Sequence, residues 1–353
     1  MPPPVTLFGA GSWGTALAVH LARAGREVTL WGRRAERVDE IRRSGENPTY
    51  LPGVRIPSSV EVTSNLDQAA EAANLWALAV PSQHLRTVAD TLRPHTRPEG
   101  IVVSLAKGIE NDTLLTMSQV LQEVLGDLAE GHIGVVSGPS HAEEVAEGRP
   151  TSLVAAAPTA DAARALQKAV ITERLRVYAN TDVLGVEIGG AAKNVLAIAA
   201  GIGDGVGYGD NAKAALVTRG LAEIRRLGQA MGARPETFSG LSGIGDLVAT
   251  CTSEHSRNRR LGELIGEGRD LGEVLDAMEM VAEGVRTTQS LVALAERHEV
   301  EMPIAAAVHA VLFDDKRPGE MVKRLMTRTA KSELGLPDSV EPIDPARPSP
   351  QST

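Results

Sequence analysis

The chain has 353 residues, a formal net charge of −9 at pH 7 and a single cysteine, Cys251. This length suits about two domains with substantial cores, and one cysteine excludes an internal disulfide and disfavours a thiolate metal cluster. The acidic balance argues against general nucleic-acid binding, and no segment reads as a membrane span or a signal peptide, so we expect a cytoplasmic protein.

The amino terminus predicts a dinucleotide-binding unit. Val5–Phe8 is a β-prone run, the turn Gly9-Ala-Gly11-Ser-Trp-Gly14 follows, residues 15–24 have a helical pattern, and residues 27–31 supply a second strand. In such a βαβ unit the glycines permit a tight turn and close approach of a pyrophosphate, which the helix N-terminus attracts. The glycine motif alone is weak and a plain glycine turn is the alternative, but the flanking strand and helix favour dinucleotide binding.

Arg33 and Arg34 stand where NAD-preferring sites usually place Asp or Glu. Two guanidinium groups suit a 2′-phosphate, so we expect NADPH/NADP to be favoured, with NADH/NAD as the alternative. Adjacent arginines also occur in plain solvated turns, and arginine can stack on adenine whichever dinucleotide is bound.

Strand-like and helix-like segments alternate in the first half of the chain, which predicts an open, doubly wound, Rossmann-like sheet of the α/β class. After the first two, the expected strands are residues 61–64, 75–80, 101–105, 133–136, 151–155 and 175–178.

After Asn180 the β-prone runs stop, so the second domain is expected to be all-helical. Its predicted helices are residues 182–200, 211–231, 257–265, 271–280, 285–298 and 304–313. We therefore divide the chain into a dinucleotide-binding domain at 1–180, a helical substrate and catalytic domain at 181–336, and a disordered, dispensable, proline-rich tail at 337–353.

Functional residues of doubly wound folds gather where the strands end. Lys107 follows the predicted strand 101–105 and can reach into the crevice as a fixed positive charge, with an ordinary surface lysine as the alternative. His141 ends the run Ser-Gly-Pro-Ser-His after the strand 133–136. It is a weaker candidate base, because it begins a helical pattern and can simply face solvent.

Lys193 lies in the small, apolar run 186–200, which predicts a helix buried on nearly every side. Glu187 is badly placed around this helix to neutralise the ammonium. Burial without a close partner lowers a lysine pKa toward the range useful for proton transfer at neutral pH, so Lys193 is the candidate acid/base. The alternative is a lysine that reaches solvent or pairs with a distant carboxylate.

The triplet Ser256, Arg257 and Asn258 precedes a helical run. Backbone amides, a hydroxyl, an amide and a guanidinium at a helix start together suit a phosphate group. The alternative is simple N-capping by Ser256 beside solvated arginines.

The chain closely resembles the bacterial NAD(P)-dependent glycerol-3-phosphate dehydrogenases from residue 5 to about residue 333. The shared motifs include Gly-Ala-Gly-Ser-Trp-Gly-Thr-Ala-Leu-Ala, Ala-Val-Pro-Ser-Gln, Ala-Lys-Gly-Ile-Glu, Ser-Gly-Pro-Ser-His-Ala, Lys-Asn-Val-Leu-Ala-Ile-Ala-Ala-Gly, Gly-Asp-Leu and Ser-Arg-Asn, in the family's order. The resemblance implies NAD(P)H-dependent reduction of dihydroxyacetone phosphate to sn-glycerol 3-phosphate, and its reverse, for phospholipid synthesis.

The resemblance also implies roles for single residues, with Lys193 as the proton donor and acceptor. The substrate would be lined by Lys107, Gly138, Ser140, Lys193, Asp246, Ser256, Arg257 and Asn258, with Arg257 and Asn258 gripping its phosphate. Beside Gly9, Gly11 and Gly14, the cofactor would be held by Ser12, Trp13, Arg33, Arg34, Lys107 and Ala142 from the first domain and by Arg257, Val281 and Glu283 from the second.

Two rival functions are weighed against this one. A β-hydroxyacid or ketopantoate type of dehydrogenase shares the two-domain plan and a comparable lysine, but its carboxylate substrate does not require the Ser256-Arg257-Asn258 grip. A catalytically silent NADPH sensor would not need a buried Lys193. No metal is expected because no cluster of ligands has suitable spacing, and an all-helical second domain suggests a homodimer.

Overall fold

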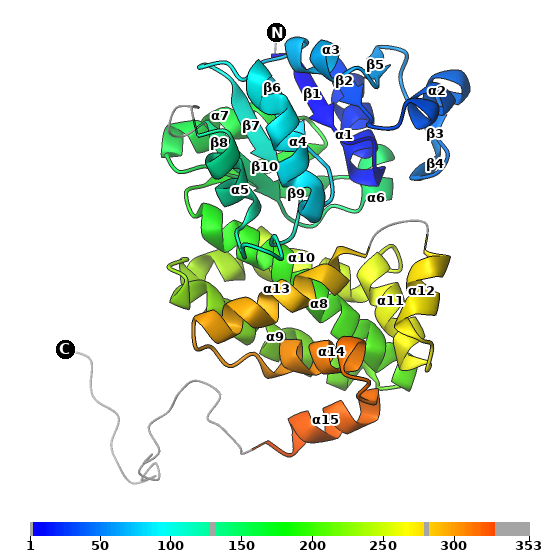
Figure 1. The fold of residues 1–353 in the computed structure, drawn as a ribbon, viewed down its shortest axis with the longest axis vertical. Coiled ribbons are helices and arrows are strands. Elements are labelled where there is room, and N and C mark those ends of the chain that lie inside the picture. Colours follow the sequence, from blue (N-terminus) through cyan, green and yellow to red (C-terminus); the bar gives the residue numbers. More distant parts are fainter. Residues whose placement is uncertain (1–2, 127–131, 279–281, 329–353) are drawn as a thin grey trace, which may run out of the picture.

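The computed structural model describes residues 3–126, 132–278 and 282–328. Two halves are stacked along the long axis of the molecule (Figure 1): a sheet half, residues 5–180, and a helical half, residues 183–326. The expected fold class is confirmed, and the predicted tail at 337–353 lies outside the described residues.

The sheet half is built on eight strands in the order β10-β9-β8-β7-β6-β1-β2-β5. All eight predicted strands form, within a few residues of their expected ends. Their bounds are β1 Val5–Phe8, β2 Val28–Trp31, β5 Val60–Thr63, β6 Leu75–Leu78, β7 Ile101–Ser104, β8 Ile133–Ser137, β9 Thr151–Ala156 and β10 Leu175–Asn180. A small antiparallel pair, β3 Glu46–Asn47 and β4 Leu51–Arg55, was not predicted.

The sheet is mixed, because β8 and β9 pair antiparallel while β9 and β10 pair parallel. The connection from β8 to β9 contains only the five-residue helix α6, Ala142–Ala146. A crossover to a parallel neighbour needs a longer connection that runs the length of the sheet. This short connection instead lets β9 begin at the same edge of the sheet where β8 ends. The candidate site residues Gly138, Ser140 and His141 therefore lie in the segment where the chain reverses direction.

Helices cover both faces of the sheet. Leu7 of β1 belongs to a buried apolar cluster with side chains of α1 Ser12–Arg23, α2 Ala35–Ser44 and α7 Ala160–Val170. The adjacent Phe8 points to the opposite face, because successive strand side chains alternate, and packs with α3 Leu66–Glu71, α4 Leu85–Leu92 and α5 Met117–Val124. Doubly wound packing is thus confirmed.

The described residues of the helical half contain helices and turns and no strand. The helices are α8 Val183–Val206, α9 Asp210–Ala230, α10 Asp246–Thr252, α11 Arg257–Gly266, α12 Leu271–Ala277, α13 Glu283–Arg297, α14 Pro303–Phe313 and α15 Pro318–Met326. The six predicted helices all form, α8 runs beyond its expected end at Ala200, and α10 and α15 were not predicted. The predicted end of α12 at Met280 lies outside the described residues.

The expectation that no segment has the length and apolarity of a membrane span was wrong for α8. Among the described residues this one helix is long and apolar enough by length and composition, but 83% of its most apolar window is buried inside the protein. It runs through the middle of the helical half (Figure 1), where it packs against α9, α10, α11, α13 and α14. Its apolarity therefore reflects a core position.

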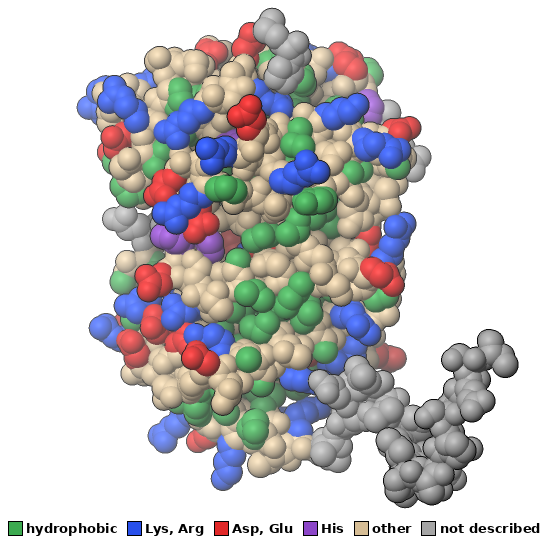
Figure 2. Space-filling model, turned by 180° about the vertical axis from the view of Figure 1, so that it is seen from behind, with side chains coloured by type: hydrophobic (Ala, Val, Ile, Leu, Met, Phe, Trp, Pro, Cys, Tyr) green, Lys and Arg blue, Asp and Glu red, His purple; other side chains and the backbone are tan. Residues whose placement is uncertain are grey.

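Charges on the surface are mixed in sign. On the face in Figure 2, acidic and basic side chains are interspersed and apolar side chains occupy much of the middle. An anionic ligand must therefore be attracted by a local cationic site, since the formal net charge is −9.

Glycines let α8 and α11 pack with their backbones in contact. A Cβ on Gly201 of α8 would overlap the carbonyl oxygen of Arg259 and lie 2.8 Å from the amide nitrogen of Glu263. A Cβ on Gly262 of α11 would likewise overlap the carbonyl oxygen of Ile198. Neither backbone can yield without separating the two helices.

We expect Gly201→Ala to lower the free energy of unfolding by about 2 kcal/mol or more, because the new methyl group meets backbone atoms rather than a flexible side chain. Urea denaturation measures this change. Gly203→Ala is the matched control, since Gly203 lies in the same helix with no atom within 4 Å of its Cβ position. The control should be neutral or stabilising by up to about 1 kcal/mol, and equal losses in both variants would contradict the backbone-contact explanation.

Candidate active site

The turn between β1 and α1 has the shape that a dinucleotide requires. Gly9 has φ +120°, and a Cβ there would lie 2.8 Å from the carbonyl carbon of Ala79. At Gly11, the residue before α1, a Cβ would meet no atom within 4 Å, and no side chain caps the helix. The first amides of α1 are thus accessible to a pyrophosphate, so these residues fit the expected cofactor.

The residues expected to flank the cofactor lie close together. Trp13 packs against a small cluster that contains Ala142 of α6 and Leu51 of β4. Ser12 is buried at the start of α1, and Gly14 lies against the Gly9 carbonyl with no room for a Cβ. The unpredicted β3–β4 pair therefore borders the glycine turn.

Arg33 and Arg34 follow β2 and are both exposed. Within the described residues, neither guanidinium has a hydrogen-bond or ion-pair partner. Arg34 precedes α2, and its carbonyl oxygen accepts hydrogen bonds from Arg37 N and Val38 N. Both side chains are thus available to a ligand at the end of β2.

A buried carboxylate, Asp246, joins the two candidate lysines. Lys193 Nζ donates to Asp246 Oδ1 at 2.6 Å and to Thr250 Oγ1 at 2.7 Å. Lys107 Nζ donates to Asp246 Oδ2 at 2.7 Å and to the Gly138 carbonyl oxygen at 2.9 Å. Lys193 is 7% exposed and Asp246 1% exposed, so both ion pairs lie largely out of water.

The expectation that Lys193 lacks a close partner was therefore wrong, although its burial was predicted correctly. Burial still outweighs the attraction of Asp246 and, with the repulsion of Lys107, lowers the pKa of Lys193 from 10.5 to about 8. Burial opposes ionisation of Asp246 as well, but the two lysines prevail and hold its pKa below the usual value. The site thus has a lysine that can exchange a proton near neutral pH.

Thr250 was not singled out from the sequence. It lies one turn after Asp246 in α10, so both side chains face Lys193, and its hydroxyl also donates to the Asp246 carbonyl oxygen at 2.6 Å. The π-turn Leu241–Gly245 leads the chain into α10. Gly189 of α8 allows this turn to approach, because a Cβ there would lie 2.5 Å from the Ser242 carbonyl oxygen.

Gly138 and Ser140 lie beside Lys107 in the turn after β8. Gly138 has φ +128°, and its carbonyl oxygen accepts from Ser140 Oγ at 2.9 Å as well as from Lys107. His141 is partly buried, with Nε2 3.4 Å from the Ala249 carbonyl oxygen and its ring centroid 5.8 Å from that of His255. It therefore lies between the two halves of the protein rather than facing solvent.

The Ser256-Arg257-Asn258 triplet forms the start of α11. Ser256 caps the helix, since its hydroxyl accepts from Arg259 N at 3.2 Å, as the capping alternative predicted. Asn258 uses its side chain internally: Nδ2 donates to Asn194 Oδ1 at 3.0 Å and Oδ1 accepts from Gly284 N at 3.0 Å. This amide ties α11 to the residue next to Lys193, while the Arg257 side chain is exposed.

Glu283 begins α13 and contacts the sheet half. Its Oε1 accepts from Ser82 N at 2.9 Å, and burial raises the pKa of this carboxyl to about 7. Val281, the other expected cofactor residue in this segment, lies outside the described residues. The described ranges contain no group of three or more His, Cys, Asp or Glu that could hold a metal ion.

The chain is similar to known proteins along nearly its whole length. Family models described as NAD-dependent glycerol-3-phosphate dehydrogenase N-terminus and C-terminus match residues 4–163 and 182–323. Glycerol-3-phosphate dehydrogenases [NAD(P)+] 1 and 2 of Salinibacter ruber are 68% and 66% identical, over 96% and 97% of this chain and 99% and 100% of their own. The crystal structure of glycerol-3-phosphate dehydrogenase from Coxiella burnetii superposes with a TM-score of 0.88 at 39% identity, covering 93% of this chain and 99% of its own.

We expect Asp246→Asn to lower the free energy of unfolding at pH 7 by about 3 kcal/mol, because two buried ammonium groups lose their shared anion. The loss should shrink at about pH 9.5. Above its pKa of about 8, wild-type Lys193 is mostly neutral and no longer attracted to Asp246.

Urea denaturation at both pH values measures the two losses. Asp39→Asn is the control, since it breaks only an exposed ion pair with Arg42 and should change stability by less than about 0.5 kcal/mol. A loss at Asp246 that does not depend on pH would show that Lys193 does not change its protonation state between the two pH values.

Proposed function

The chain belongs to the NAD-dependent glycerol-3-phosphate dehydrogenase family, and on that premise we propose that it reversibly reduces dihydroxyacetone phosphate to sn-glycerol 3-phosphate with NAD(P)H. The observation that carries the proposal is the buried Lys193 ammonium, 2.6 Å from Asp246 and bonded to Thr250. We further propose that the product supplies glycerophospholipid synthesis.

Lys193 is the proposed acid and base. When bound, the reduced nicotinamide supplies a hydride to the substrate's carbonyl carbon. Lys193 stabilises the negative charge that develops on the carbonyl oxygen and donates a proton from Nζ, a step typically worth about 10²- to 10⁴-fold in rate. Its pKa of about 8 lets it give up that proton and regain it near neutral pH.

Asp246 and Thr250 orient the Lys193 ammonium, and Lys107 provides a second positive charge. Lys107, Gly138 and Ser140 are proposed to line the substrate from the sheet half, and Lys193 and Asp246 from the helical half. Their proximity supports this assignment, since Lys107 bonds both Asp246 and the Gly138 carbonyl.

The start of α11 is the proposed phosphate site. The Arg257 side chain is exposed at the first residue of α11, so an anion bound there would lie at the positive end of the helix. Because the Asn258 side chain is bonded to Asn194 and Gly284, its proposed contribution is the backbone amide. This phosphate grip favours dihydroxyacetone phosphate over the carboxylate substrates of the rival dehydrogenases.

The two halves are proposed to divide the remaining work. Residues 1–180 would bind the cofactor and residues 181–336 would carry the substrate and catalytic groups. Cofactor contacts are assigned to Gly9, Gly11, Ser12, Trp13, Gly14, Arg33, Arg34, Lys107, Ala142, Arg257, Val281 and Glu283. The open Gly11 position and the two exposed arginines support this assignment.

We also propose a cytoplasmic homodimer that binds no nucleic acid. The helical half also exposes the apolar side chains of Val206, Val248 and Leu275. The net charge of −9 supports the absence of nucleic-acid binding.

The enzyme should oxidise NADPH rapidly with dihydroxyacetone phosphate and only slowly with unphosphorylated dihydroxyacetone. Lys193→Ala should lose at least about 10²-fold in kcat while NADPH binding, followed by fluorescence, persists. Lys168→Ala, an exposed lysine of α7, is the control and should keep wild-type kinetics. Cofactor binding without turnover by the wild-type protein would instead support a sensor.

Replacing Arg33 and Arg34 by serine should raise the KM for NADPH by roughly tenfold or more and leave that for NADH nearly unchanged, because only NADPH has a 2′-phosphate to lose its charged partners. Steady-state kinetics with both cofactors measure the ratio. Arg164→Ser, at an exposed ion pair on α7, is the control. Equal losses with both cofactors would assign the arginines to adenine stacking, and no loss would make them a solvated turn.

A further inference from the structure

The loop that follows β7 brings Lys107 to Asp246, and hydrogen bonds within the loop hold its two ends together. Residues 105–116 form a narrow turn in which Glu110 N donates to the Leu115 carbonyl at 2.9 Å and Leu114 N to the Glu110 carbonyl at 2.9 Å. An isolated bridge joins Ile109 to Thr116. The loop is therefore a compact unit, and its placement decides where Lys107 lies.

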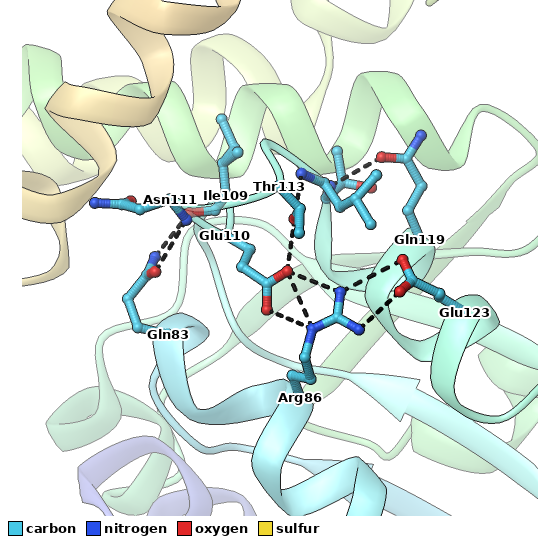
Figure 3. A network of polar contacts seen from close by, with 10 residues as sticks. Gln83, Arg86, Ile109, Glu110, Asn111, Thr113, Gln119 and Glu123 are labelled. Atoms are coloured by element: carbon cyan, nitrogen blue, oxygen red, sulfur yellow. Dashed lines mark hydrogen bonds and ion pairs between the residues drawn. The ribbon is translucent and has the colours of Figure 1, made fainter.

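Arg86 of α4 binds this unit through Glu110 (Figure 3). Its Nε donates to Glu110 Oε1 at 2.9 Å and its Nη2 to Glu110 Oε2 at 2.8 Å, while Thr113 Oγ1 donates to the same carboxylate at 2.6 Å. Glu110 is 8% exposed. A two-point bond to a buried carboxylate fixes both distance and orientation, which a single contact does not.

Gln83, three residues before Arg86, hydrogen-bonds to the loop backbone on either side of Glu110. Its Nε2 donates to the Ile109 carbonyl at 2.7 Å and its Oε1 accepts from Asn111 N at 3.0 Å, as Figure 3 shows. The segment 82–86 thus holds the loop on both sides of Glu110.

The loop is also inserted into the helical half. Ile109 is fully buried in the core that surrounds α8, and Asn111 Nδ2 donates to Gln289 Oε1 of α13 at 3.2 Å. Ser82 N bonds Glu283 Oε1 directly. A displacement of the loop would consequently move Lys107 relative to Asp246 and Lys193.

We propose that Arg86 and Glu110 are positioning residues for the dehydrogenase reaction: their ion pair fixes the 105–116 loop so that Lys107 stays bonded to Asp246. Neither residue contacts Lys107, Asp246 or Lys193, so they act through the loop backbone. The inference concerns the same active site and, for its kinetic consequences, rests on the proposed function.

The position of Lys107 affects the protonation of Lys193. The titratable groups that act on Lys193 or respond to it are Asp246, Lys107, Glu283, His141 and Cys251. If Lys107 moves away, Lys193 loses a repelling charge and has Asp246 to itself, and water gains access. All three changes raise the pKa of Lys193 from about 8 toward its ordinary 10.5.

Glu110→Gln and Arg86→Met test the proposal, with Arg86→Lys as a milder variant that keeps the charge and loses the two-point bond. Glu123→Gln is the matched control, because it removes the other partner of Arg86, 57% exposed and 3.0 Å away, without touching the loop. Reductive methylation followed by mass spectrometry measures the reactivity of Lys107 relative to the exposed Lys168, with no need for turnover.

We expect Lys107 to be methylated roughly tenfold faster in Glu110→Gln and Arg86→Met, since the loop opens more readily once its ion pair is lost. In the reduction direction, kcat/KM should fall on the order of tenfold. The alkaline limb of the pH profile of kcat/KM, where Lys193 loses its proton, should move upward on the order of one pH unit. The double variant should add little to either single one, and Glu123→Gln should match the wild type throughout.

Variants that unfold at lower temperature yet keep wild-type Lys107 reactivity would overturn the proposal and leave the ion pair a purely structural role. An unmoved alkaline limb in an active variant would overturn its link to Lys193. Failure of the wild-type protein to reduce dihydroxyacetone phosphate would count against the proposed function alone, because the methylation result stands without it.

Discussion

One buried carboxylate organises this protein. Asp246 is 1% exposed and bonds two ammonium groups, Lys107 from the sheet half and Lys193 from the helical half. Either lysine alone with Asp246 would form an ordinary ion pair. Two lysines on one carboxylate leave a net positive charge in a place that excludes water, which suits a reaction in which an oxygen becomes negative. The charged groups of the candidate site therefore lie at the junction of the two halves.

The surrounding structure keeps these three groups at their positions. Gly189 lets the Leu241–Gly245 turn approach α8, so that Asp246 enters beside Lys193. Glu187 lies six residues before Lys193 in α8. Its carboxylate accepts hydrogen bonds from Ser118 N and Oγ at the start of α5, and so joins the helical half to the segment that follows the 105–116 loop. Buried polar side chains at the junction thus serve the alignment of the halves, because each satisfies backbone or charged groups from the opposite half.

Local sequence patterns predicted what depends on local physics. The glycine turn, the strands, the α8 core helix and the burial of Lys193 follow from spacing and apolarity, and the strand ends pointed to Lys107. The partner of Lys193 could not be found this way, because Asp246 lies in a short helix after an irregular turn, distant in sequence. The reversal of β9 depends on the brevity of α6, and the internal bonding of the Asn258 amide depends on how α8, α11 and α13 meet. These features depend on contacts between segments distant in the chain, which the spacing of apolar residues does not reveal.

The backbone contact between α8 and α11 has a consequence for substrate size. Lys193 lies on α8 and the proposed phosphate site begins α11, and the two backbones touch at Gly201 and Gly262, so the helices cannot move closer together there. The Asn194–Asn258 bond adds a polar tie at the same end. The separation between Lys193 and the proposed phosphate site is therefore fixed by the backbone contact of the two helices. On the proposed assignment, a phosphorylated ketone one carbon longer that bound its phosphate at the start of α11 would present a different atom to Lys193, so this fixed spacing would select for chain length.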